Sequence, residues 1–228
     1  MQEEQAQDYS FVLVEDSAES RLFIELSSYG ADLTEARGAV ELAFRLREQD
    51  SPLSDAVPYL IGFAVVAYCR TILASNVRAA MTSHFQIPSD LAKTHEDIKA
   101  FRNATIAHSQ SDLAVTYPVG VLDGETLEVV HVMGATVSSA LPWSVVRDFQ
   151  TLLERVEDLV DQAIEPVRLK LEARLRGADR HAMVANGVTP SAIHKLAVDF
   201  NPKSKRRRFA TSHSVYGDPV TPNEIPPT

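Results

Sequence analysis

Residues 142–165, PWSVVRDFQTLLERVEDLVDQAIE, decide the class of fold. Apolar side chains recur in this stretch every three or four residues, with carboxylates on the opposite side. The apolar stripe is Val145, Phe149, Leu152, Val156, Leu159 and Ala163, and the acidic residues are Glu154, Glu157, Asp158 and Asp161. This pattern predicts a long amphipathic helix that packs one face on a core. Pro166 is expected to kink, end or restart the helix, whose apolar pattern continues to Gly177.

Three earlier segments repeat this periodicity. Residues 33–48 predict one helix, and residues 51–73 predict a second, in which Pro58 leaves the first residue open. The second segment is apolar around most of its circumference, so it is expected to be the central helix. A third helix should begin after residues 87–90, IPSD, and run towards His108. The chain is therefore predicted to be mainly α.

The pattern changes to short β-prone runs after Gln110. Asp123-Gly124 lies between LAVTYPVGVL and ETLEVVHVM, which predicts a β-hairpin at about 113–133 inserted in the helical domain. We divide the chain into an N-terminal segment (1–30), a helical domain (31–177), a short helical or linker segment (178–200) and a tail (201–228). In the N-terminal segment, YSFVLVED fits either a strand or the start of a helix. The tail is rich in proline and small polar residues, which predicts disorder.

Composition and charge argue against a general nucleic-acid-binding surface, a membrane segment and a signal peptide. The 228 residues carry a formal net charge of -9; residues 1–194 hold 16 Lys and Arg against 28 Asp and Glu, whereas residues 195–228 hold 6 against 3. An acidic body is a poor general surface for phosphates, so an RNA site must be local or assembled between subunits. The single cysteine, Cys69, fits a reducing compartment, and the apolar run 56–69 is shorter than the roughly 20 residues of a membrane span. We expect a cytoplasmic protein without a membrane segment or a signal peptide.

Residues 101–110, FRNATIAHSQ, carry the candidate chemistry. A guanidinium such as that of Arg102 can hold a phosphate in a fork, and a histidine such as His108 can move a proton near neutral pH. These two groups suffice to cleave RNA without a metal, with the 2′-hydroxyl as nucleophile. P-loop, dinucleotide-binding, HExxH and paired CxxC motifs are absent from the sequence, and we expect no cofactor and no metal.

The spacing of the two groups leaves alternatives open. Six residues separate Arg102 from His108, which places them about 120° apart on a straight helix. Either the helix unwinds near residues 106–109, or a second subunit completes the site. His95 lies seven residues before Arg102 on the same face and is a secondary candidate. A packing role for His108, which continues the apolar stripe, is the simpler interpretation.

The sequence also resembles a known superfamily. Arg102-Asn103 followed by His108 within IKAFRNATIAHS resembles the RNA-cleaving motif of HEPN (higher eukaryotes and prokaryotes nucleotide-binding) proteins. The ending AHS, the preceding THEDIK with His95, and AYCRTI at residues 67–72 particularly resemble the branch found among bacterial abortive-infection proteins. The similarity covers about residues 30–175.

The resemblance implies a helical bundle that forms a homodimer with two motifs facing each other across a cleft. Arg102 would contact the scissile phosphate, Asn103 would orient the site, and His108 would act as acid or base. Many members of this superfamily are binding or assembly modules, and several active ones are toxins or antiviral effectors with a partner such as an antitoxin or another defence protein.

Two further features are weaker candidates. Arg70 on the central helix is a secondary candidate for the same cleft. Five basic tail residues can hold RNA or DNA electrostatically, although such runs are often simply solvated; they are Lys203, Lys205, Arg206, Arg207 and Arg208. The leading hypothesis is a metal-independent endoribonuclease of HEPN type, and the alternative is a catalytically inactive HEPN-like module that binds a protein or nucleotide partner.

Overall fold

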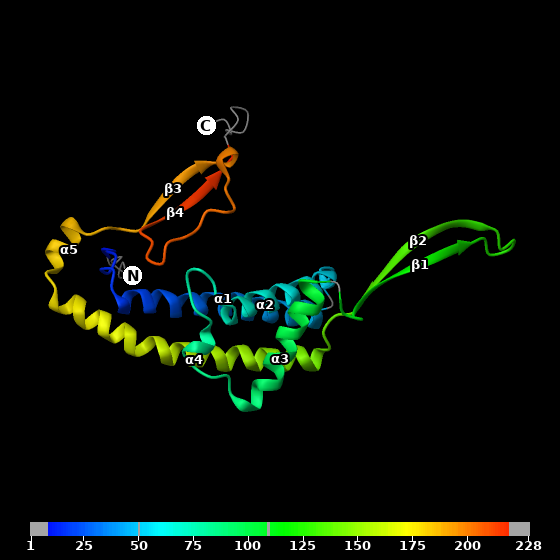
Figure 1. The fold of residues 1–228 in the computed structure, drawn as a ribbon, viewed down its shortest axis with the longest axis horizontal. Coiled ribbons are helices and arrows are strands. Elements are labelled where there is room, and N and C mark those ends of the chain that lie inside the picture. The colour runs from blue at the N-terminus through cyan, green and yellow to red at the C-terminus, as the bar shows by residue number, and fades with distance from the viewer. Residues whose placement is uncertain (1–8, 50, 109, 219–228) are drawn as a thin grey trace, which may run out of the picture. The chain divides into compact units, whose positions relative to one another are not determined.

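The computed structural model describes residues 9–49, 51–108 and 110–218 and is mainly helical, as predicted (Figure 1). The chain divides into two compact units. The helical unit comprises Leu26–Ser75 and Ala79–Ala163. The terminal unit comprises the described residues before Leu26, Asn76–Arg78, and the described residues after Ala163.

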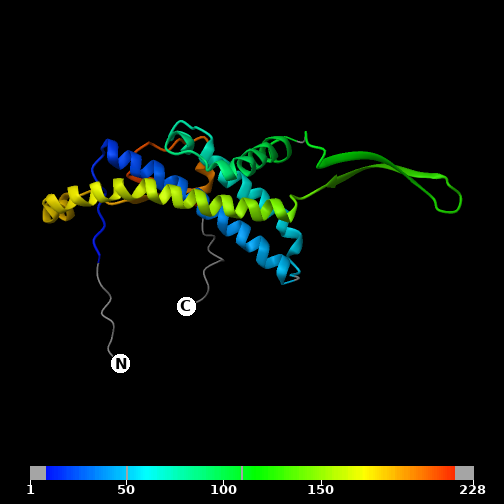
Figure 2. The same ribbon diagram turned by 90° about the horizontal axis from the view of Figure 1, so that it is seen from below.

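Four helices build the helical unit. These are α1 (Ala18–Glu48), α2 (Val57–Ile72), α3 (Ala92–Phe101) and α4 (Trp143–Gly177), with α1 and α4 also reaching into the terminal unit. Within the helical unit α1 and α4 lie side by side, and Arg37 of α1 donates to Glu157 of α4 at 2.9 Å (Figures 1 and 2). The core of this unit is made of apolar side chains from all four helices, among them Leu33, Val40, Tyr68, Ile98, Phe149 and Val156.

Two helices are longer than the sequence pattern indicates. The helix predicted over 33–48 begins at Ala18, and its earlier part contributes the buried side chains Leu26 and Tyr29. The helix α4 continues through Pro166 to Gly177, so this proline neither ends nor restarts it. The buried stripe of α4 is also rotated from the predicted one, because Val146, Leu153 and Val160 are buried whereas Val145, Leu159 and Ala163 are only half-buried.

The helix α2 is the central helix that the sequence predicts. Pro58 occupies its first turn, and seven of its side chains are buried. With the preceding 3₁₀ turn, Ser54–Ile72 is long and apolar enough to cross a membrane by length and composition alone. Its buried face packs in the helical core.

The predicted hairpin is confirmed and extends further than expected. β1 (Ala114–Leu122) pairs antiparallel with β2 (Val129–Ser138), with an irregularity between Val121 and Leu122. The connection spans residues 123–128 and is therefore longer than a two-residue Asp-Gly turn. The Asp123 carboxylate accepts hydrogen bonds from the backbone N–H groups of Thr126 and Glu125, which lower its pKa.

The terminal unit contains two strands that the sequence analysis did not predict. After α5 (Arg180–Asn186), β3 (Ser191–Leu196) pairs in parallel with β4 (Ser212–Gly217). The prediction of a disordered tail over 201–228 is therefore wrong for β4, and residues 219–228 lie outside the described residues. β4 gains backbone hydrogen bonds from β3, and Tyr216 packs edge-on against Phe200 with ring centroids 5.2 Å apart. Amino-acid composition alone does not reveal that a segment has a partner strand or an aromatic contact.

Candidate functional site

A π-helical turn carries the first two residues of the motif. Arg102–Ile106 continue α3 as a π-helix, in which the backbone N–H of Ala107 donates to the Arg102 carbonyl at 2.9 Å. The chain then bends at Ala107 and His108. The departure from α-helical geometry thus starts at Arg102, earlier than the unwinding near residues 106–109 that was one predicted alternative. Single π-turns within helices occur frequently at functional sites.

The three motif side chains differ in exposure. Arg102 is half-buried, whereas Asn103 and His108 are exposed. Arg102 Nη1 donates to Asn103 Oδ1 at 3.0 Å, so the amide oxygen holds one arm of the guanidinium fork. The exposure of His108 does not fit a packing role within one chain. Within the described residues, the structure joins Arg102 to Asn103 and shows no hydrogen bond from Arg102 to His108.

His95 is buried and points into the helical core. Its Nδ1 lies 2.7 Å from the Tyr68 hydroxyl, and the two rings meet edge to face. Burial lowers the pKa of His95; nearby Glu96 opposes this shift and Lys99 adds to it. His95 is therefore placed to support the helix that carries the motif. Sequence reasoning counted Tyr68 only as an apolar stripe residue, because a hydrogen bond between two helices leaves no pattern in the sequence.

Cys69 follows Tyr68 on α2, and the positive charge of Arg102 affects the pKa of its thiol. Burial raises the pKa of its thiol to about 11, while the positive charges of Arg102 and Lys99 act in the opposite direction. The thiol is thus protonated and unreactive near neutral pH. This interaction places Arg102 close to α2, on which Cys69 lies.

Arg70, the other secondary candidate, is held by α1. Its Nη2 lies 2.7 Å from Asp32 and also contacts Glu35. Two carboxylates therefore balance its charge, which leaves it less able to bind a phosphate. Among the residues that the structure describes, no group of three or more His, Cys, Asp or Glu side chains is placed to hold a metal ion.

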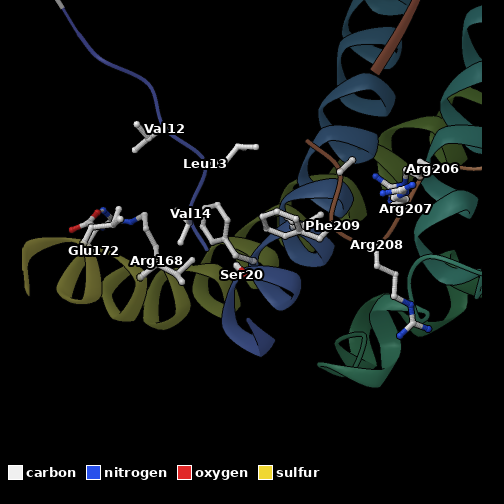
Figure 3. A pocket seen from close by; sticks show the side chains of 15 residues that line it. Val12, Leu13, Val14, Ser20, Arg168, Glu172, Arg206, Arg207, Arg208 and Phe209 are labelled. Carbon is white, nitrogen blue, oxygen red and sulfur yellow. The ribbon is translucent and has the colours of Figure 1, made fainter. Parts of the chain in front are cut away.

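The basic cluster belongs to the terminal unit. Lys203, Lys205 and Arg206–Arg208 are exposed, and the three arginines border a mainly apolar cavity of about 450 Å³. Figure 3 shows the arginines at the end of this cavity opposite Arg168 and Glu172, which pair with each other. The cluster is thus an exposed cationic patch on the chain between β3 and β4.

Fold and site together define a mainly helical protein with a long β-hairpin and an Arg-Asn-His motif in which Asn103 and His108 are exposed. Comparisons with protein-family models, with curated proteins and with solved structures give no match to this chain.

Proposed function

We propose that this chain is a cytoplasmic, metal-independent endoribonuclease of the HEPN type, which acts as a homodimer in a toxin or phage-defence setting. The observation that supports the proposal is the π-turn, which presents the joined Arg102 and Asn103 side chains and is followed at once by an exposed His108. A guanidinium that its neighbour already orients loses less freedom when it binds a phosphate.

The proposed reaction is an in-line displacement within the RNA strand. Arg102 binds the non-bridging oxygens of the scissile phosphate and stabilises their charge. One His108 accepts the proton of the 2′-hydroxyl while the 2′-oxygen forms a bond to phosphorus. The bond from phosphorus to the 5′-oxygen breaks, and the 5′-oxygen takes a proton from the His108 of the second copy. The products are a 2′,3′-cyclic phosphate and a 5′-hydroxyl.

A catalytically inactive assembly module is the second candidate. One observation favours it: the β1–β2 hairpin exposes many large apolar side chains. Such a module would use its surface to bind a protein or nucleotide partner, such as an antitoxin.

Cleavage of RNA in excess EDTA tests the proposal. Arg102→Ala and His108→Ala are each expected to reduce the rate constant by about 100-fold or more, because each removes a group that acts in the transition state. Arg155→Ala on α4 and His181→Ala on α5 are matched controls, since both side chains are exposed outside the motif, and both variants should cleave like the parent. Gel electrophoresis of a labelled RNA measures the rates.

Folding and oligomeric state must be equal in all five proteins, as judged by circular dichroism and sedimentation. If the parent leaves the RNA intact, or if all five proteins cleave at one rate, the ribonuclease proposal fails. The assembly module is then the better description.

A further inference from the structure

The β1–β2 hairpin has two faces of different character. Residues that pair across the strands share a face, and successive residues alternate between faces. The register pairs Tyr117 with Ala135 and Val119 with Met133, which places these side chains on one face. We call this the apolar face; it consists of Val115, Tyr117, Val119, Val121, His131, Met133, Ala135 and Val137. The opposite face has mostly small or hydroxyl side chains, namely Ala114, Thr116, Pro118, Gly120, Val132, Gly134, Thr136 and Ser138.

Among the residues that the structure describes, none forms a layer over the apolar face. Tyr117, Met133 and Val137 are 52%, 46% and 58% exposed. Within the helical unit the two strands run out beyond the helices (Figure 1). A two-stranded hairpin in water is only marginally stable by itself, and a hydrophobic sheet face normally packs on a second layer. We therefore expect another apolar surface to pack on this face.

The chemistry of the face restricts what can cover it. β1 and β2 contain no Asp, Glu, Lys or Arg, and His131 is the only residue of the face that can carry a positive charge, so the face offers little to the phosphates of RNA or to a charged helix. A matching surface must be apolar, of similar length and free of charge. The same face of a second copy meets these requirements, because a two-fold axis brings identical patches together.

We propose that the apolar faces of two copies pack on each other, so that two hairpins form a four-stranded, two-layer sandwich. The sheets would lie about 10 Å apart, as in other sheet-on-sheet packings. The apolar face supplies eight side chains per copy, about a third of the roughly 20–30 residues that each partner contributes to a stable interface, so the sandwich would form one part of a larger dimer interface. This inference deepens the proposed function, since it rests on the homodimer proposed there and names the surface that joins its subunits.

A matched pair of lysine variants tests the proposal. Val119→Lys puts a charge on the apolar face, whereas Val132→Lys puts the same charge on the opposite face. Val119→Lys should raise the dimer dissociation constant by on the order of 100-fold, because its charge would be buried without a partner. Val132→Lys should dimerise like the parent. Sedimentation velocity over a dilution series measures both constants, and circular dichroism checks that the hairpins remain folded.

Cysteine variants provide a second readout that does not depend on destabilising the dimer. A short bis-maleimide should link Val119→Cys proteins into covalent dimers and leave Val132→Cys proteins mostly unlinked. The native Cys69 is buried, and its raised pKa keeps it unreactive, so it adds little background.

Three results would overturn the inference: a monomeric parent, equal dissociation constants for the two lysine variants, or equal cross-linking of the two cysteine variants. A measurement of RNA cleavage distinguishes failure of the hairpin interface from failure of the proposed ribonuclease function. A dimer that depends on Val119 but cleaves no RNA keeps the hairpin interface and rejects the ribonuclease. If Arg102→Ala abolishes cleavage but Val119→Lys leaves the dimer unchanged, the ribonuclease proposal is kept and the hairpin interface is rejected.

Discussion

At the scale of single residues, Tyr68 and His95 explain how the motif helix is anchored. Burial raises the pKa of the Tyr68 hydroxyl, which keeps it protonated and able to donate to His95 Nδ1. The Nε2 atom of the same imidazole lies 3.6 Å from Glu96 Oε1. This pair joins α2 to α3. Tyr68 directly precedes Cys69 on α2, and His95 lies two helical turns before Arg102 on α3.

The lowered pKa of His95 predicts an acid-sensitive fold. Below its ordinary pKa near 6.5, His95 takes up a proton more readily in the unfolded chain than in the folded one. Its contribution to the free energy of unfolding is therefore complete above that pH and is lost as the pH falls through the folded pKa. Urea unfolding at about pH 7.5 and about pH 5 should show a smaller loss on acidification for His95→Gln than for the parent. An equal loss in both proteins would contradict this role.

Thr105 predicts a stabilising substitution inside the motif. Its hydroxyl oxygen is buried and has no hydrogen-bond partner among the described residues. Valine has nearly the same shape without the polar atom, so Thr105→Val should raise the free energy of unfolding by about 1 kcal/mol. Denaturant unfolding measures the change, and the exposed Thr151→Val on α4 is the control, expected to change stability by less than about 0.5 kcal/mol. A destabilised Thr105→Val protein would mean that the hydroxyl has a partner.

The sequence predicts part of this residue-level picture. The residue types single out Arg102 and His108, and the resemblance to HEPN proteins adds Asn103; their joint role as a site stays a prediction. The roles of Tyr68 and Thr105 depend on burial, and the pairing of Arg70 with Asp32 depends on the neighbouring helix. No periodicity encodes these contacts.

At the scale of elements, an aromatic contact ties α2 to α4. Phe149 is fully buried and meets Tyr68 edge to face, with ring centroids 5.5 Å apart. Phe149→Ala should lower the free energy of unfolding of the helical unit by about 3–5 kcal/mol, because it leaves a cavity between these helices. Tyr59→Ala removes a ring that is 79% exposed on α2 and should cost less than about 1 kcal/mol. Thermal or urea unfolding followed by circular dichroism compares the two; similar losses would contradict the packing described.

The predictable elements are those whose pattern is local. The helices α2, α3 and α4 and the second half of α1 show regular apolar spacing, and the hairpin has a turn signal between two β-prone runs. The first turns of α1 escaped prediction because Ser27, Ser28 and Gly30 interrupt the pattern. The strands β3 and β4 are short and pair in parallel across an intervening loop, so each depends on the other for its hydrogen bonds.

At the scale of the whole molecule, the observed units differ from the predicted domain over 31–177. Their borders fall at Leu26 in α1 and at Ile164 in α4. Sequence analysis places domain borders in loops rich in glycine, proline or polar residues. A border inside a continuous helix carries no such composition, which explains why one domain was predicted.

The pairing of α1 with α4 also sets the order of events during synthesis. Arg37 and Glu157 are bonded although 120 residues separate them. A ribosome that adds about 5–20 residues per second needs on the order of ten seconds to make that interval. Throughout this time the face of α1 that α4 will cover has emerged without α4, so it is open to chaperones that bind exposed hydrophobic segments until α4 leaves the exit tunnel.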